Sequence, residues 1–149
     1  SNEQKAAKLG VERVSLEDLF HRSDVVSLHT PWLEQTEGMI TGAQLASMKP
    51  NASFINTARG AVVREQEMIE VLEQRPDLYA ILDVTYPEPP EPGSPLYTLP
   101  NVVLTPHIAG SLDQECQRMG RIAVEEFKRY LNGEPLQWSI SREQAATLA

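Results

Sequence analysis

Cysteine is nearly absent from this sequence, since Cys116 is the single one among 149 residues. One thiol cannot form an internal disulfide, and it cannot supply the paired thiolates of a cysteine-rich metal site. Cys116 has no motif partner nearby, so we interpret it as a structural residue. Such sparse use of cysteine is typical of proteins in a reducing compartment, and we expect a cytoplasmic location.

Basic residues and long apolar runs are also scarce. The chain has 13 Lys and Arg residues against 21 Asp and Glu residues, which gives a formal net charge of -8. Nucleic acids and anionic membrane surfaces attract basic patches, so neither is an expected partner. No apolar stretch approaches the roughly 20 residues that a transmembrane helix needs, and no signal peptide is visible. The remaining composition, 41% hydrophobic and 23% charged, is ordinary for one globular domain or part of a larger one.

Apolar β-prone runs alternate with segments of helical periodicity along the chain. The alternation predicts a parallel sheet with right-handed helical crossovers. The strands are apolar on both faces, which predicts helices on both faces of the sheet, as in doubly wound folds. The predicted strands are residues 11–14, 24–28, 52–55, 78–84 and 102–104. The predicted helices are residues 3–9, 16–22, 41–48, 64–74 and 111–131.

Local signals define the remaining segments. Six of the eleven prolines lie within residues 87–100, which predicts an irregular loop inside one domain. Ser111 and Gln114 match a capping box at the start of a long C-terminal helix, and Asn132 with Gly133 ends it. The helix has an apolar face that we expect to pack mainly on the sheet. The tail, residues 134–149, shows no core face of its own.

Ionisable residues follow three of the predicted strands. Arg59 follows residues 52–55, Asp83 lies at the end of the next strand with Glu88 five residues further on, and His107 follows the last strand. Parallel strands end at one edge of a sheet, where open α/β sheets bind their ligands. A His can donate or accept a proton near neutral pH, and a carboxylate on its other ring nitrogen fixes its tautomer. An Arg offers a planar fork of donors that suits a carboxylate. We therefore predict a site for proton transfer on an anionic substrate, with any redox chemistry supplied by a cofactor.

Each of these residues also has a structural interpretation. Alone, Arg59 is typical of a surface residue after a core strand, Glu88 of a solvated loop residue, and Asp83 of a strand-end cap. His29 could join His107 and Glu88 around a metal ion, but the sequence has no compact ligand motif, and we predict no metal site. The ordered combination of these residues is what favours the catalytic interpretation.

The combined motifs resemble the C-terminal half of the NAD(P)-dependent D-isomer-specific 2-hydroxyacid dehydrogenases. The resemblance covers roughly residues 5 to 136, with the motifs in family order and spacing. The matching segments are Ser27-Leu28-His29-Thr30-Pro31, Met48-Lys49-Pro50, Ile55-Asn56-Thr57-Ala58-Arg59-Gly60, Leu82-Asp83-Val84 through Glu88-Pro89, and residues 99–110 (LPNVVLTPHIAG). Together these motifs are highly specific, whereas any one of them alone would be weak.

The resemblance implies a partial Rossmann-like fold and a set of residue roles. Arg59 would bind and polarise a 2-oxo acid, His107 would be the general acid/base at its C2 oxygen, and Glu88 would orient His107 and favour its protonated form. Residues near an NAD cofactor, with NADP not excluded, would be Thr30, Pro31, Thr36, Thr57, Ala58, Arg59, Asp83, His107 and Gly110. The implied reaction is hydride transfer between a nicotinamide and a D-2-hydroxy or 2-oxo acid.

Two family features have no counterpart in this sequence, namely the G-x-G-x-x-G loop and the substrate-binding domain. We therefore expect residues 1–133 to be the C-terminal portion of a nucleotide-binding domain, with residues 134–149 as a tail toward the substrate domain. Such a part would be inactive alone, and its parent enzyme would be a homodimer. Position 85 is Thr where the family commonly has an aromatic residue. The alternative function is a non-catalytic nucleotide-sensing or dimerisation module of the same fold.

Overall fold

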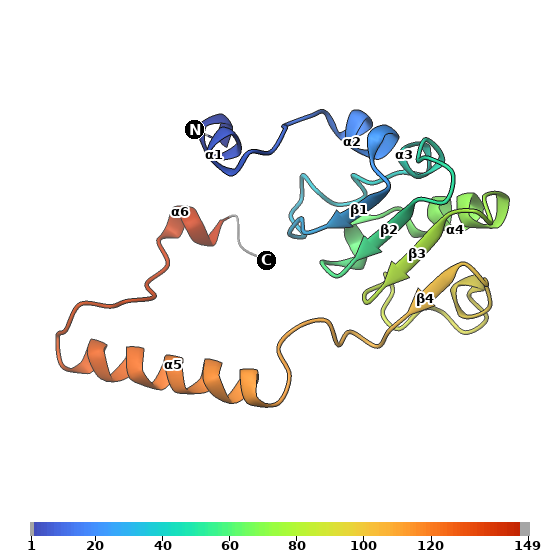
Figure 1. The fold of residues 1–149 in the computed structure, drawn as a ribbon. Helices are drawn as coiled ribbons and strands as arrows, with labels where there is room; N and C mark the ends of the chain where they lie inside the picture. The colour runs from blue at the N-terminus through green and yellow to red at the C-terminus, as the bar shows by residue number, and fades with distance from the viewer. Residues whose placement is uncertain (1, 147–149) are drawn as a thin grey trace.

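The computed structural model describes residues 2–146, and its centre is a four-stranded parallel sheet (Figure 1). The strands follow one another in the order β1-β2-β3-β4. Their bounds are β1 Val25–Leu28, β2 Ser53–Asn56, β3 Tyr79–Leu82 and β4 Val102–Leu104. The predicted α/β fold with a parallel sheet is confirmed. The strand predicted at residues 11–14 is wrong, because that segment is an exposed connection between two helices.

The helices are close to their predicted positions. They are α1 Asn2–Leu9, α2 Leu16–Arg22, α3 Gly42–Ala46, α4 Glu65–Gln74, α5 Gln114–Leu131 and α6 Arg142–Ala145, with 3-10 turns η1 Gly60–Val62 and η2 Pro95–Tyr97. The hydroxyl of Ser15 accepts the Asp18 N–H and caps α2 at 3.0 Å. The predicted cap of the long helix at Ser111 is wrong: α5 begins at Gln114, so Asp113 occupies the capping position.

One face of the sheet carries the core. Alternate strand residues such as Val26, Phe54 and Ala80 lie in register and are buried. Helices α2 to α4 cover this face, and the ring of Phe20 from α2 meets that of Phe54 at 6.0 Å between centroids. The prediction of helices on both faces is not met within residues 2–146, since Val25 and Tyr79 on the other face are 56% and 49% exposed. Sequential strand order with right-handed crossovers places every connecting helix on the same side.

The long helix α5 leaves the sheet instead of packing on it (Figure 1). Every side chain of α5 is at least partly exposed, and those of Phe127 and Tyr130 are 61% and 69% exposed. The prediction that its apolar face packs mainly on the sheet is therefore wrong. Helical periodicity shows which face is apolar but not which surface it meets. None of the helices within residues 2–146 is both long enough and apolar enough to span a bilayer.

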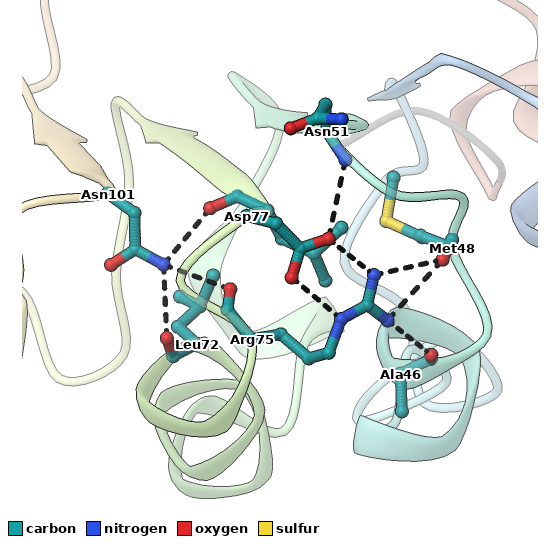
Figure 2. A network of polar contacts seen from close by, with 8 residues as sticks. Ala46, Met48, Asn51, Leu72, Arg75, Asp77 and Asn101 are labelled. Atoms are coloured by element: carbon teal, nitrogen blue, oxygen red, sulfur yellow. Dashed lines mark hydrogen bonds and ion pairs between the residues drawn. The ribbon is translucent and has the colours of Figure 1, made fainter.

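A hydrogen-bonded network fastens the amino-terminal edge of the sheet (Figure 2). Asp77 precedes β3 and binds Arg75 through both carboxylate oxygens, at 2.9 and 2.7 Å. Arg75 also donates to the carbonyls of Ala46 and Met48 at the end of α3. The buried side chain of Asn101, just before β4, donates to three carbonyls at the end of α4 and the start of β3. These contacts hold the ends of α3 and α4 against the starts of β3 and β4. The opposite edge of the sheet, where the strands end, takes no part in this network.

Candidate active site

The predicted site residues lie in loops at the carboxyl-terminal edge of the sheet. Thr30 follows β1, Arg59 follows β2, Asp83 and Glu88 follow β3, and His107 follows β4. Parallel pairing brings these loops to one edge, as expected from the strand order. The structure therefore gathers residues that are up to 77 positions apart in the sequence, counting from Thr30 to His107.

His107 and Glu88 form a direct pair. The ring Nδ1 of His107 lies 2.7 Å from Oε1 of Glu88, and both side chains are about half exposed, at 46% and 41%. His107 has a left-handed backbone with φ of 54°, which is uncommon for a residue other than glycine. Its N–H donates to the carbonyl of Asp83 at 3.0 Å. With Nδ1 held by the carboxylate, the ring nitrogen Nε2 is directed away from Glu88.

Asp83 organises the loop that carries His107. It is 4% exposed, and its carboxylate accepts hydrogen bonds from the Thr105 hydroxyl and from the N–H groups of Ile108 and Ala109. Burial opposes ionisation, but these three hydrogen bonds outweigh it and hold the pKa of Asp83 below its ordinary value. Within this chain, Asp83 thus fixes the backbone on both sides of His107, in addition to its predicted place near the cofactor.

The turn that carries Arg59 depends on Asn56, which the sequence interpretation did not select. Asn56 is the buried last residue of β2, and its side chain accepts the Ala58 N–H at 3.0 Å and donates to the Arg59 carbonyl at 3.2 Å. This is the local side-chain bonding that makes Asn a turn former, so its place after an apolar run was the available signal. Arg59 is half-buried, and its Nη1 donates to the Ala58 carbonyl at 2.7 Å.

Three contacts hold the turn between Asp83 and Glu88. Gly60 packs so closely on Thr85 that an added Cβ would overlap the Thr85 backbone. The Thr85 hydroxyl donates to the Pro87 carbonyl at 2.8 Å. Glu65, at the start of α4, accepts the Tyr86 N–H at 2.9 Å, and burial raises the pKa of its carboxyl despite that hydrogen bond. The sequence offered no signal for Glu65 beyond an acidic residue in a first helical turn.

Two cavities open at this edge and share Thr85 and Glu88. The first, about 710 Å³, extends from His107 and Asp83 toward Tyr97 and the proline-rich loop. The second, about 260 Å³, contains Arg59 between Trp32 and Tyr86. Glu88 thus contacts His107 and also lines the cavity of Arg59. A small carboxylic acid bound beside Arg59 would therefore lie near the ring of His107.

The other predicted cofactor residues surround the same edge. Thr36 donates to the Pro31 carbonyl at 2.6 Å and so shapes the loop after β1. Thr30, Thr57 and Ala58 are small, partly exposed residues at strand ends. Gly110 lies in open space, since apart from its chain neighbours no atom of residues 2–146 comes within 4 Å of a Cβ placed there. Small, partly exposed residues and the open space at Gly110 leave this edge accessible to an extended nucleotide.

The structure does not gather metal ligands around His29. In residues 2–146, no group of three or more His, Cys, Asp or Glu side chains is placed to hold a metal ion. The ring Nε2 of His29 lies 2.9 Å from the Ser27 hydroxyl.

Comparisons with known proteins extend these observations. The sequence model of the family "D-isomer specific 2-hydroxyacid dehydrogenase, NAD binding domain" matches residues 1–109. A glyoxylate reductase of Korarchaeum cryptofilum is 42% identical over 85% of this chain and 38% of its own length. A D-3-phosphoglycerate dehydrogenase of Archaeoglobus fulgidus is 34% identical over 94% of this chain and 27% of its own length. The chain thus spans well under half the length of these relatives.

Solved structures share the fold. D-mandelate dehydrogenase of Rhodotorula graminis superposes with a TM-score of 0.82 and 34% identity, covering 95% of this chain and 42% of that one. D-lactate dehydrogenase of Lactobacillus jensenii, solved with NAD+, has a TM-score of 0.77, 31% identity and coverage of 89% and 44%. A dehydrogenase of Xanthobacter autotrophicus, solved with NADPH, has a TM-score of 0.73, 32% identity and coverage of 86% and 41%. With its parallel sheet and its matched residues 1–109, this chain belongs to the D-isomer specific 2-hydroxyacid dehydrogenase family, in the part that is the NAD-binding domain.

Proposed function

We propose that this chain is part of an NAD(P)-dependent D-2-hydroxyacid dehydrogenase, in which Arg59, Glu88 and His107 are the catalytic residues. The observation that carries the proposal is the pair of His107 Nδ1 and Glu88 Oε1, 2.7 Å apart, beside the cavity that contains Arg59. An oriented imidazole and a guanidinium suit the reduction of a ketone that bears a carboxylate. Both residues follow strands of one parallel sheet, at the edge where open α/β sheets bind their ligands.

The proposed chemistry assigns one task to each residue. When bound, the nicotinamide supplies the hydride that reduces C2 of a 2-oxo acid, or accepts it from C2 of a 2-hydroxy acid. During reduction, the protonated ring of His107 donates the Nε2 proton to the C2 oxygen as the carbonyl π electrons move onto that oxygen. Glu88 accepts the hydrogen bond of Nδ1 and stabilises the charged ring. Arg59 binds the substrate carboxylate through its fork of donors and stabilises the developing negative oxygen.

The proposed cofactor site uses the small residues of the same edge. Thr30, Pro31, Thr36, Thr57, Ala58 and Gly110 would line the nucleotide, and Asp83 would lie near its carboxamide. Asp83 already accepts three hydrogen bonds, so we assign it a second task, which is to hold the His107 loop. NAD is the proposed cofactor and NADP the alternative, since solved relatives hold NAD+ or NADPH.

We further propose the organisation of the whole enzyme. Residues 1–133 would complete a nucleotide-binding domain, and residues 134–149, of which 147–149 lie outside the described part, would contact a substrate domain. The exposed apolar residues of α5, such as Phe127 and Tyr130, support a further contact surface. A homodimer and a cytoplasmic location complete this proposal, the latter supported by the single cysteine.

The test is NADH and NADPH oxidation by the full-length protein against a panel of 2-oxo acids. We expect turnover with at least one acid and a fall in kcat of about 10²–10⁴-fold in His107→Ala, because the general acid is lost. His21→Ala, an exposed histidine of α2, is the matched control and should keep its activity. Undiminished turnover in His107→Ala would refute the assignment. Cofactor binding without turnover of any acid would favour a nucleotide-sensing module.

A further inference from the structure

The cavity beside Arg59 has an aromatic wall made by Trp32 and Tyr86. Trp32 comes from the loop after β1 and Tyr86 from the loop after β3, and both line the cavity with Arg59 and Glu88. Their ring centroids are 5.4 Å apart, with an interplanar angle of 65°, which is an edge-to-face contact. The two rings therefore form one continuous apolar surface next to the proposed site of the substrate carboxylate.

Glutamates hold each half of this wall in place. The indole Nε1 of Trp32 donates to Glu37 Oε2 at 3.0 Å. The backbone N–H of Tyr86 donates to Glu65 Oε2 at 2.9 Å. The rings nevertheless remain 43% and 53% exposed, so each has apolar surface that a ligand can cover. The two rings are therefore held in place by hydrogen bonds but remain partly exposed to solvent, unlike the side chains of the core.

The size of the cavity suits an apolar group. Its volume is about 260 Å³. A cavity of roughly 150 Å³ lined by apolar side chains can hold benzene. The space beside the wall is therefore sufficient for a phenyl or branched aliphatic substituent, in addition to the carboxylate that Arg59 binds.

The charges around the cavity disfavour a second anion. Of the described residues that line it, Arg59 alone carries a positive charge, and that charge is matched by one substrate carboxylate. Glu88 also lines the cavity, while Glu37 and Glu65 accept hydrogen bonds from the Trp32 indole and the Tyr86 backbone. Within this part of the chain, a phosphate at C3 of the substrate would face Glu88 with no second cation beside it, which raises the cost of binding.

We propose that Trp32 and Tyr86 bind the substituent at C3 of the substrate and select 2-oxo acids with an apolar or aromatic substituent over phosphorylated ones. This inference rests on the proposed dehydrogenase function and adds a substrate class to it. The names of the relatives include both a D-3-phosphoglycerate dehydrogenase and a D-mandelate dehydrogenase, so family membership leaves this selection open.

The test compares kcat/KM of the full-length enzyme for phenylpyruvate, glyoxylate and phosphohydroxypyruvate. We expect the wild-type enzyme to prefer phenylpyruvate to phosphohydroxypyruvate by about 100-fold. Trp32→Leu and Tyr86→Leu should each lower the ratio of phenylpyruvate to glyoxylate efficiency by about 10–100-fold, because glyoxylate has no substituent to contact the wall. Trp32→Phe keeps an aromatic ring and should restore most of that ratio.

Tyr79→Leu is the matched control, since Tyr79 is a tyrosine of similar exposure, 49%, at the opposite end of β3. It should leave the ratio unchanged. An unchanged ratio in both wall variants, or a wild-type preference for phosphohydroxypyruvate, would overturn this inference while the dehydrogenase function stands. A protein that binds NADH but reduces none of the acids would overturn the proposed function, and this inference with it.

Discussion

The two edges of the sheet each place an arginine near carboxylates and backbone carbonyls, but they use it differently. At the amino-terminal edge, Arg75 directs all three of its guanidinium nitrogens at Asp77 and at the carbonyls of Ala46 and Met48 (Figure 2). At the carboxyl-terminal edge, the guanidinium of Arg59 makes a single hydrogen bond within residues 2–146, to the Ala58 carbonyl. A guanidinium whose N–H groups are all hydrogen-bonded within the protein has a structural role. A guanidinium with N–H groups left over has donors that a ligand can use.

Arg59→Lys tests the carboxyl-terminal half of this comparison and has the largest expected effect. An ammonium is a point charge and lacks the planar fork that pairs with a carboxylate. We expect kcat/KM for a 2-oxo acid to fall by about 10²–10³-fold in the full-length enzyme. Arg118→Lys, an exposed arginine of α5 paired with Glu115, is the control. Equal kinetics in both variants would mean that the free donors of Arg59 have no ligand.

Gly60→Ala tests a residue at the carboxyl-terminal edge that, unlike Arg59, has a packing role. The added methyl group would overlap the Thr85 backbone, which cannot move without displacing the turn that carries Glu88. We expect a loss of about 1–3 kcal/mol in the free energy of unfolding, measured by urea denaturation. We also expect reduced turnover. Gly120→Ala is the control and should not destabilise the protein, because no described residue outside the backbone of its own helix comes within 4 Å of the added Cβ.

Asp77→Asn tests the amino-terminal half and has the smallest expected effect. The hydrogen bond from Arg75 lowers the pKa of Asp77 to about 2, from an ordinary value of 3.8. A carboxyl whose pKa is lowered by folding stabilises the protein above its unfolded pKa, and this stabilisation is lost as pH falls toward 2. The Tm difference between wild type and variant should therefore be constant near neutral pH and shrink between about pH 4 and 2. A difference independent of pH in that range would contradict the pairing.

The sequence predicted what depends on local pattern. The four central strands and the helices around them follow from apolar periodicity and caps such as Ser15. The placement of Arg59, Glu88 and His107 at one edge follows from strand ends in a parallel sheet. The contact of His107 with Glu88 agrees with the family resemblance. Their catalytic roles stay predictions until activity is measured.

Other features depend on contacts that a linear pattern does not reveal. Apolar periodicity predicted that the sheet face carrying Val25 and Tyr79 and one side of α5 are apolar. It could not predict which surface, if any, packs against them. Glu65 holds the site through one hydrogen bond to loop backbone and Asn56 through two, and such bonds appear only once the loops are built. The wall of Trp32 and Tyr86 joins two loops 54 positions apart, counting from Trp32 to Tyr86, and no spacing rule connects them.

The two edges of the sheet thus divide the work: the amino-terminal edge holds the fold together, and we propose that the carboxyl-terminal edge carries the catalytic residues. The most direct measurement is kcat and Tm, side by side, for Asn101→Ala and His107→Ala in the full-length enzyme. Asn101→Ala removes the donor to buried carbonyls, so its Tm should fall by about 2–8 °C while the folded protein keeps its kcat. His107→Ala should lose kcat while keeping its Tm. The reverse pattern, or equal losses of both quantities in both variants, would contradict the division between the two edges.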